Sequence, residues 1–379
     1  MKSKVVVLRC ESYDQEKVNA VIEKGIDLLG GIASFVNPSE KILLKPNLLS
    51  RHSPDSAVTT NPAVFEAAAR LLFEKQYSSL YYGDSPGHPG NIEKTASICG
   101  IKAAAERYNL SLGEFSKGKT IEFPEGITAK SFEICQAALD CGAIINICKM
   151  KTHQLERITG AVKNMLGCVC GINKARMHVK FPNPDSFGKM LVDLNRFLKA
   201  RLHIMDGITA MEGNGPAGGD KTQMNCILMS ADPVALDAVF CRLINLDTEL
   251  VPTIVFGEQF ALGNSRESSI EILGDDINEL VNLNFKAERG SVKLQLASFA
   301  GFIKTFLTKR PYIKNALCRR CGFCIDSCPV DGKAIYYPNA NREKTPKFDY
   351  NKCIRCYCCQ ELCPEKAVFV KKPFLGNFV

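Results

Sequence analysis

The chain has 379 residues, of which 46% are hydrophobic and 23% charged, so it is long enough for one large domain and one small one. Its net charge of +8 is unevenly placed. From residue 301 onward, 15 Lys and Arg against 6 Asp and Glu give +9, which leaves −1 for the first 300 residues. No apolar run is long enough to cross a bilayer, and no signal peptide precedes the first strand-like run. Because many of the eighteen cysteines lie in apolar runs as free thiols, we expect a reducing, cytoplasmic location without membrane contact.

Short apolar runs alternate with amphipathic segments over the first 275 residues. Runs rich in β-branched residues predict strands, and apolar residues near 3.6-residue spacing predict helices. We expect strands at 4–10, 41–44, 79–82, 111–115, 120–123, 143–148, 201–205, 225–229 and 270–273, with helices at 16–29, from Pro62 onward, and at 92–108, 185–199 and 233–244. This alternation predicts an α/β fold, a Rossmann-like domain at residues 1–275 whose central sheet is parallel or mixed.

A repeated cysteine motif organises the end of the chain. It reads Cys-x2-Cys-x2-Cys-x3-Cys-Pro at 318–329 and again at 353–364. This is the bacterial-type ferredoxin pattern, in which the fourth Cys of each run ligates the other cluster. The pattern predicts two [4Fe–4S] clusters, one held by Cys318, Cys321, Cys324 and Cys363, and the other by Cys353, Cys356, Cys359 and Cys328. The segment resembles two-cluster ferredoxin domains, which implies a small α+β domain at 312–379 after a connector at 276–311.

Zinc is the alternative occupant of Cys-x2-Cys pairs, but a zinc ion uses four ligands, and a repeated triplet with a fourth Cys exceeds that number. Cys358 lies out of register and is expected to be a non-ligand. Two oxidised clusters, at about −2 each with their thiolates, offset about half of the basic surplus of this segment. The remaining charge would attract a low-potential electron donor of the ferredoxin or flavodoxin type, while nucleic acid is not expected as a partner. The cluster chemistry also suggests an anaerobe.

Polar segments follow four of the predicted strands, at 45–47, 83–85, 149–167 and 206–219. Ligands bind at the carboxyl ends of strands in open α/β sheets, so these segments would converge on one crevice if their strands are neighbours. The crevice would then be lined by lysines, with His153 beside them: Lys45, Lys149, Lys151 and Lys163. Such lysines suit a carboxylate or phosphate, which predicts an anionic small-molecule ligand. A solvated basic loop is the alternative.

Other candidate groups in the large domain are less specific. Asp206 and Glu212 are candidate acid–base or metal-orienting groups, although loop carboxylates are often solvated or capping. Cys168 and Cys170 could bind a metal only with further ligands such as Cys148 and His178, so buried structural thiols are favoured. No Walker A or dinucleotide fingerprint is present, and nothing argues for or against a flavin, so a further organic cofactor is left open.

Six phrases of the large domain resemble the family called domain of unknown function 362: LLKPNLL (43–49), GDSPG (83–87), KMKTH (149–153), TGAVKNMLG (159–167), INKARMH (172–178) and DGITAMEGNGP (206–216). Members of this family often carry a C-terminal two-cluster ferredoxin module. The resemblance implies binding residues at Lys45, Asn47, Asp84, Lys149, Lys151, Lys163, Asn164 and Lys174, and catalytic candidates at His153, His178, Asp206 and Glu212. A more distant likeness is to the lactate racemase superfamily, whose nickel-pincer nucleotide we do not carry over.

Together these patterns predict an iron–sulfur oxidoreductase. The ferredoxin domain would deliver single electrons to an anionic substrate or cofactor in the Lys/His-lined crevice, and His153 or His178 would supply a proton. Three alternatives stay open: a non-enzymatic electron-transfer protein or redox-complex subunit, an RNA- or nucleotide-modifying enzyme, and a non-redox enzyme with structural clusters.

Overall fold

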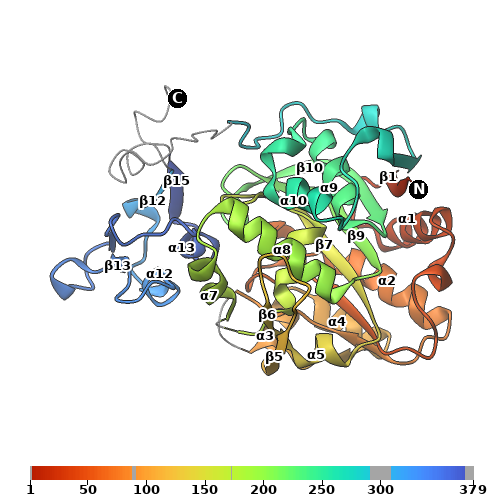
Figure 1. The fold of residues 1–379 in the computed structure, drawn as a ribbon, viewed down its shortest axis with the longest axis horizontal. Helices are drawn as coiled ribbons and strands as arrows, with labels where there is room; N and C mark the ends of the chain where they lie inside the picture. The colour runs from red at the N-terminus through yellow and green to blue at the C-terminus, as the bar shows by residue number, and fades with distance from the viewer. Residues whose placement is uncertain (1, 88–90, 172, 291–308, 372–379) are drawn as a thin grey trace.

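A mixed β-sheet forms the centre of the large domain in the computed structural model, which describes residues 2–87, 91–171, 173–290 and 309–371 (Figure 1). The strand order is β11-β1-β10-β9-β7-β2-β3-β4, with β8 paired to β7 off this path. Only β10 (with β1 and β9) and β8 (with β7) pair antiparallel among the described strands of this sheet; the other pairings are parallel. The strands are β1 (Ser3–Arg9), β2 (Ile42–Pro46), β3 (Leu80–Tyr82), β4 (Ser111–Leu112), β7 (Ala143–His153), β8 (Arg157–Thr159), β9 (Leu202–Glu212), β10 (Asp220–Ser230) and β11 (Ile270–Gly274).

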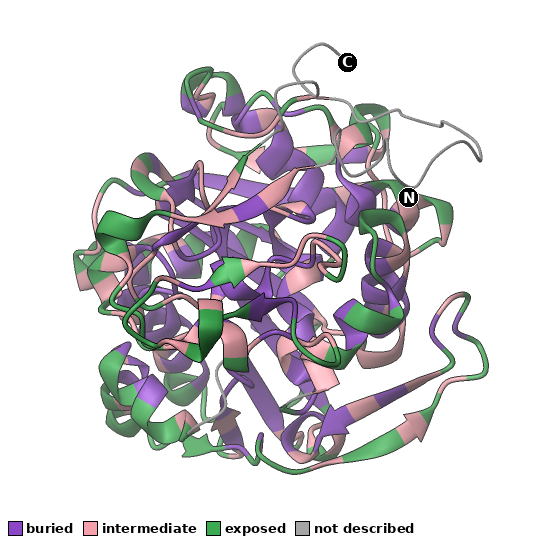
Figure 2. Cartoon of the chain, turned by 90° about the vertical axis from the view of Figure 1, so that its left-hand side faces the viewer, coloured by how far each residue is buried: buried purple, intermediate pink, exposed green. Residues whose placement is uncertain are grey.

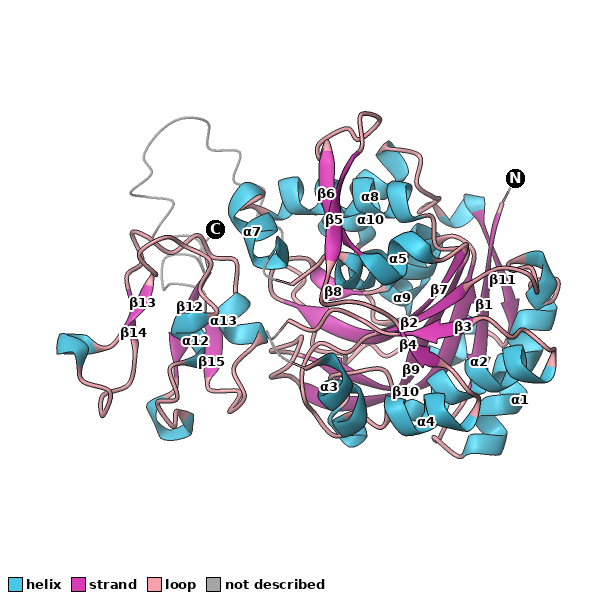
Figure 3. Ribbon diagram, turned by 90° about the horizontal axis from the view of Figure 1, so that it is seen from below, coloured by secondary structure: helices cyan, strands magenta, loops and turns pink. Residues whose placement is uncertain are grey.

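Helices cover both faces of this sheet (Figures 1 and 3). Val6 and Leu8 of β1 point to one face, packed with α1 and α2, while Val5 and Val7 point to the other, packed with α8, α9 and α10. This alternation is the two-residue period of a strand that is buried on both sides. The helices are α1 (Gln15–Leu28), α2 (Pro62–Glu74), α3 (Ile92–Ile98), α4 (Ile101–Arg107), α5 (Gln136–Asp140), α6 (Ala161–Asn164), α7 (Asn173–Lys180), α8 (Pro184–Leu198), α9 (Pro233–Leu243) and α10 (Pro252–Gln259). The predicted α/β fold class with a mixed sheet is therefore confirmed.

Local signals explain where several helices begin. Asp232 caps α9 by accepting from the backbone N–H groups of Val234 and Ala235, as expected from its position before Pro233. One predicted helix is wrong: the segment 92–108 is two helices, α3 and α4, because Gly100 adopts a left-handed backbone (φ 77°) between them. Strands β5 (Gly118–Glu122) and β6 (Ser131–Cys135) form a hairpin that projects from the domain (Figure 3). The sequence predicted the first strand of this hairpin but not the second.

The two central strands are longer than predicted. All eleven residues of β7 are buried, including Lys149, Lys151 and His153, which were expected in a loop. Asp206 and Glu212 likewise belong to strand β9 rather than to the loop after it. Figure 2 shows this buried centre of the sheet. Charged residues are rarely buried in strands, so the sequence pattern ended each strand too early.

The ferredoxin domain lies beside the large domain and contains two short sheets and two short helices (Figure 1). Its elements are β12 (Arg310–Ile313), α12 (Phe323–Asp326), β13 (Ile335–Tyr336), β14 (Lys347–Phe348), α13 (Cys358–Glu361) and β15 (Val368–Lys371). Helix α13 is its element next to the large domain (Figures 1 and 3). Part of the predicted connector, residues 291–308, lies outside the described residues. Among the described helices, there is none whose length and hydropathy would let it cross a membrane.

Candidate functional site

A buried ion triad joins β7 and β9. Lys149 lies opposite Asp206 in the parallel register, and its Nζ is 2.7 Å from Asp206 Oδ2. The Tyr13 hydroxyl accepts from Lys149 Nζ at 2.9 Å and donates to Asp206 Oδ1 at 2.9 Å. Burial and the Asp206 carboxylate raise the pKa of Tyr13 well above its usual value. Since each charge has a partner, the triad is electrically balanced and fixes the two strands to the N-terminal segment.

A second buried pair is formed at the ends of β2 and β3. Lys45 Nζ lies 2.9 Å from Asp84 Oδ1, and both side chains are almost completely buried. The other oxygen of Asp84 accepts from the backbone N–H of Leu48 at 2.7 Å. Lys45 and Lys149, two of the lysines predicted to line a crevice, are thus buried, and each already has a carboxylate partner.

Lys151 and Lys163, the other two lysines of the predicted crevice, make no ion pair among the described residues, although the charge of each interacts with the Glu361 carboxylate. Lys151 Nζ, 1% exposed, donates to Asn47 Oδ1 (3.1 Å) and to the Val58 carbonyl (2.6 Å). Burial, and then the charge of Lys163, lower the pKa of Lys151 to about 7. Within the described part of the chain, the half-buried Lys163 makes no hydrogen bond or ion pair. The Lys163 ammonium group is therefore open to direct contact with an anion.

Asparagine side chains connect this region to the sheet. Asn47 Nδ2 donates to Asn164 Oδ1 at 2.9 Å, and Asn164 Nδ2 donates to Asn146 Oδ1 at 2.7 Å. The chain of amides keeps the Oδ1 of Asn47 turned toward Lys151. Asn47 and Asn164, both predicted site residues, are thus positioning residues for that lysine.

His153, the last residue of β7, meets the ferredoxin domain. Its Nδ1 accepts from the backbone N–H groups of Leu155 (3.0 Å) and Glu156 (3.1 Å), so the neutral ring carries its proton on Nε2. Nε2 lies 2.6 Å from Glu361 Oε1, at the end of α13. Burial lowers the pKa of His153 to about 4. For Glu361, burial acts to raise the pKa, but His153 and Lys163 outweigh it and hold the pKa well below its usual value.

Two further groups surround Lys163. Glu156 is fully buried, and both its carboxyl oxygens lack a hydrogen-bond partner among the described residues. Burial raises the pKa of Glu156 to about 8, although the charge of Lys163 lowers it in part, so the carboxyl is protonated at neutral pH. His178 stacks on Phe187 with ring centroids 4.2 Å apart, and burial lowers its pKa to about 3. Its Nδ1 is also without a partner in the described structure. A buried, protonated carboxyl beside a free cation is typical of a functional site.

The remaining predicted residues lie outside this group. Lys174 donates to Ser85 and to the carbonyl of Pro86, and burial lowers its pKa to about 8. Glu212 pairs with Lys286 at 3.2 Å at the far end of β9. Neither side chain contacts Lys163 in the described structure.

The motif assigns the ferredoxin cysteines to two sets, and the structure gives near neighbours for members of each. The Cys324 thiol has Cys363, Cys318 and Cys321 as its electrostatic neighbours. Cys328, Cys353, Cys356 and Cys359 line one small, mainly apolar pocket. Backbone N–H groups also point at sulfur, from Ala334 to Cys328 (3.4 Å) and from Ala367 to Cys363 (3.3 Å). Thiolate donors with N–H···S support are the environment of iron–sulfur clusters, so the donor set fits the predicted cofactor.

The cysteines of the large domain that were considered as metal ligands, Cys148, Cys168 and Cys170, are all buried. Cys148 and Cys168 are fully buried, and the thiols of Cys135 and Cys170 both donate to the Phe115 carbonyl, at 3.5 and 3.6 Å.

Comparison with known proteins decides the family. The model of the domain of unknown function 362 (DUF362) matches residues 42–242, and a 4Fe-4S dicluster domain matches residues 317–367. The chain belongs to the DUF362 family. This DUF362 protein is 33% identical over 263 residues to the thylakoid-associated protein sll1697 of Synechocystis sp., which covers 69% of this chain and 81% of that protein.

The other relatives match only a small part of the DUF362 protein. One component of the H(2):CoB-CoM heterodisulfide,ferredoxin reductase of Methanothermobacter marburgensis is 30% identical over 87 residues, 20% of this chain and 13% of that protein. One component of the ion-translocating oxidoreductase complex of Buchnera aphidicola is 34% identical over 74 residues, 18% of this chain and 16% of that protein. Together with the dicluster domain, these matches give the protein an iron–sulfur electron-transfer role.

Among solved structures, the lactate racemase apoprotein of Thermoanaerobacterium thermosaccharolyticum aligns with a TM-score of 0.40 at 10% identity. The alignment covers 61% of the DUF362 chain and 55% of the racemase chain.

Sequence reasoning missed Glu156 and Glu361. Glu156 follows a polar segment and has the appearance of a solvated loop residue, and Glu361 lies between two cluster cysteines in another domain. The only signal for Glu361 was its position two residues from both Cys359 and Cys363.

Proposed function

We propose that this DUF362 protein is an oxidoreductase that transfers single electrons from two [4Fe–4S] clusters to an anionic substrate or cofactor bound beside Lys151 and Lys163. The observation that carries the proposal is the contact between Glu361 and His153 at 2.6 Å. Glu361 lies between the predicted cluster ligands Cys359 and Cys363, whereas His153 ends the central strand of the large domain. The contact supports the proposal because it joins the segment of predicted cluster ligands to the region of Lys163 and Glu156.

Each residue of the crevice has a role that follows from its charge. Lys163 would bind the anionic group of the ligand, because it is a cation without a partner in the described structure. Lys151, with a pKa near 7, would gain its full charge when an anion approaches. Glu156 would donate the proton that follows the electron, since it holds a proton up to about pH 8.

This assignment changes the role of the histidines. With pKa values of about 4 and 3, His153 and His178 are neutral at pH 7, so neither is the imidazolium that would supply a proton. His153 would position Glu361, and His178 would offer its free Nδ1 to a donor group of the ligand. The clusters would supply the electrons one at a time, and the burial of the crevice would limit the access of water to the reduced ligand.

The test is anaerobic purification of the full chain, followed by mass spectrometry of any small molecule released on denaturation, with iron and sulfide counted on the same sample. We expect about eight irons per chain, as two cubane clusters require, and a stoichiometric anionic molecule. The variant Lys163→Met should keep the iron and lose the molecule, whereas Lys119→Met, at an exposed site on the hairpin, should keep both. Full iron content with no anionic molecule in the wild-type protein, and no binding of added carboxylates or phosphates, would refute the proposal.

A second candidate function is that of a non-enzymatic electron-transfer protein or redox-complex subunit. The matches to components of two multi-subunit redox complexes favour it, although they are confined to 18–20% of this chain. An iron-loaded protein with an empty crevice that co-purifies with another redox protein would support this candidate.

A further inference from the structure

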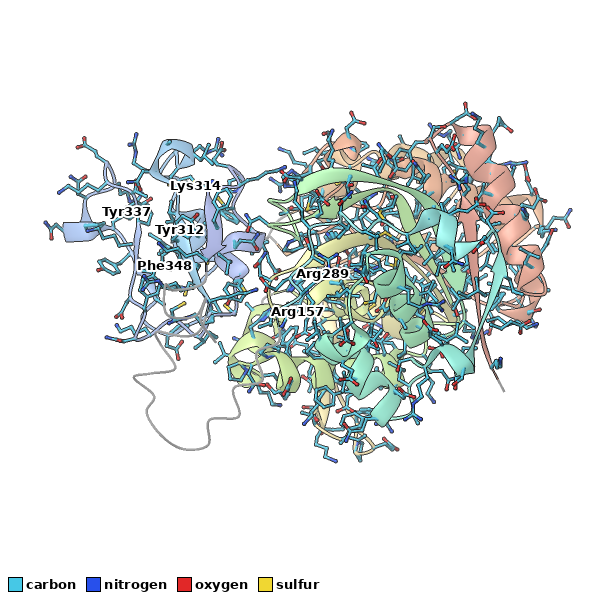
Figure 4. All side chains as sticks on the ribbon, turned by 90° about the horizontal axis from the view of Figure 1, so that it is seen from above. Arg157, Arg289, Tyr312, Lys314, Tyr337 and Phe348 are labelled. Carbon is cyan, nitrogen blue, oxygen red and sulfur yellow. The ribbon has the colours of Figure 1, made fainter. Side chains whose placement is uncertain are left out.

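The ferredoxin domain has one face on the crevice and another on solvent, and these faces differ in chemistry. Helix α13 lies on the side of the large domain, while Tyr337 lies on the outer side, away from it (Figures 3 and 4). The Tyr337 hydroxyl donates to the Arg320 carbonyl at 2.6 Å. Cys318, Cys321 and Cys324 all act electrostatically on that hydroxyl, so the first predicted cluster site lies at the outer side.

At this outer side a predicted cluster ligand reaches solvent. Cys321 is the one exposed thiol among the eighteen cysteines, all of which lie in the described residues. It lies between two residues with a left-handed backbone, Arg320 (φ 61°) and Gly322 (φ 81°). The first cluster is therefore the one that a partner protein could approach closely.

Two sets of exposed side chains adjoin Cys321 or Tyr337, and we call them the basic rim and the apolar centre. The basic rim consists of Arg319, Arg320 and Arg342, all exposed, and Arg342 lies close enough to Tyr337 to act on its hydroxyl. Arg319 pairs with Glu365 at 3.0 Å, but neither Arg320 nor Arg342 has a carboxylate partner in the described part of the chain. The apolar centre is Leu317 (47% exposed), directly before Cys318, and Tyr336 (48% exposed), directly before Tyr337.

We infer that the basic rim and the apolar centre around Cys321 form the docking surface of an acidic one-electron carrier protein with a flavin or iron–sulfur centre. A small apolar centre with a charged rim is the usual form of a weak electron-transfer interface. The rim charges would steer an acidic partner to the exposed ligand. In each encounter one electron leaves the reduced centre of the partner and reduces one cluster, and no bond forms or breaks.

This docking surface deepens the proposed function and rests on it for the direction of electron flow. Its test uses no ligand of the crevice. A reduced acidic flavodoxin is mixed anaerobically with the iron-loaded full chain, and cluster bleaching is followed by stopped flow at low and high salt. The variant Arg320→Glu/Arg342→Glu should react about tenfold more slowly at low salt and like the wild type at high salt, because salt screens exposed charges. The control Lys75→Glu/Lys119→Glu makes the same charge change at exposed sites of the large domain and should react like the wild type.

A second measurement separates docking from electron transfer. Calorimetric binding of oxidised flavodoxin should weaken about tenfold in the rim variant, with iron content unchanged. Equal rates and affinities in the rim variant and the control would overturn the inference. So would a rim variant that loses affinity for a single-stranded RNA oligonucleotide while it keeps the flavodoxin rate. An empty crevice, by contrast, would refute the proposed function and leave this docking surface intact.

Discussion

The clearest test of the crevice electrostatics is the substitution Glu156→Gln. Burial raises the pKa of Glu156 from 4.5 to about 8, so the folded protein keeps a proton that the unfolded chain releases near pH 4.5. The contribution of this group to stability is therefore complete below pH 4.5 and is lost as the pH rises toward 8. At about 1.4 kcal/mol per pH unit, the loss amounts to roughly 3 to 5 kcal/mol between these limits. Glutamine has the same shape and no ionisation, so this loss should be absent from the variant.

The assay is anaerobic thermal unfolding of the iron-loaded chain from pH 5 to pH 9. The buried amide introduced by Glu156→Gln adds a cost of about 1 to 3 kcal/mol that does not depend on pH, so the slope and not the offset is the signature. The stability of Glu156→Gln relative to the wild type should rise steadily from pH 5 to 8 and then level off. The control Glu125→Gln changes an exposed glutamate and should follow the wild type at every pH. A flat difference between Glu156→Gln and the wild type would refute the assigned pKa and, with it, the role of Glu156 as proton donor.

Three further predictions concern the ion triad, the cluster ligands and the ligand charge. Lys149→Met should destabilise the protein by about 3 to 5 kcal/mol, because it leaves the fully buried Asp206 without its cation. In thermal unfolding, the double variant Lys149→Met/Asp206→Asn should recover part of this loss. Equal losses in the two variants would contradict the reasoning. Cys328→Ser should lower the iron content from about eight to about four per chain, because Cys328 is a predicted cluster ligand. Cys358→Ser should leave the iron content unchanged, because Cys358 is not a predicted ligand. A loss of iron in Cys358→Ser would change the ligand set. Because the pKa of Lys151 lies at about 7, binding of the anionic ligand near pH 7.5 should be accompanied by the uptake of a proton at Lys151. This uptake would make the calorimetric binding enthalpy depend on the ionisation enthalpy of the buffer. Identical binding enthalpies in different buffers would exclude it.

The sequence predicted the fold class because the sheet strands are short, apolar and separated by helical periodicity. The strands that were predicted too short have one physical cause. The pattern ends a buried strand at the first charged residue, but β7 continues through Lys149 because Asp206 lies opposite it on β9 and compensates its charge. Such a pairing between residues far apart in the sequence is visible only once the strands are neighbours.

For the candidate site, the sequence predicted the kinds of side chain, whereas only the structure shows which of them have partners. The sequence predicted a crevice lined by four lysines, but in the structure Lys45 is paired with Asp84 and Lys149 with Asp206, so only Lys151 and Lys163 of the four lack an ion-pair partner among the described residues. Glu156 escaped the sequence analysis because its importance lies in burial and in the lack of a partner, and neither is encoded by a motif. The predicted cluster ligands, in contrast, follow from a covalent pattern of spacing that needs no tertiary information.

The contacts of α13 bear on the choice between an enzyme and an electron shuttle. Gln360 Nε2 donates to the carbonyls of Asn214 (2.7 Å) and Gly215 (3.2 Å), and Glu361, 8% exposed, lies against His153. A carboxylate buried in an interface between domains costs free energy unless cations nearby compensate it, and here Lys163 does so in part. A domain that shuttled electrons freely would have no use for such a group, since undocking would return it to water. The α13 interface therefore favours a ferredoxin domain that stays on the crevice, and fixed proximity of electron source and ligand is what an intramolecular reduction requires.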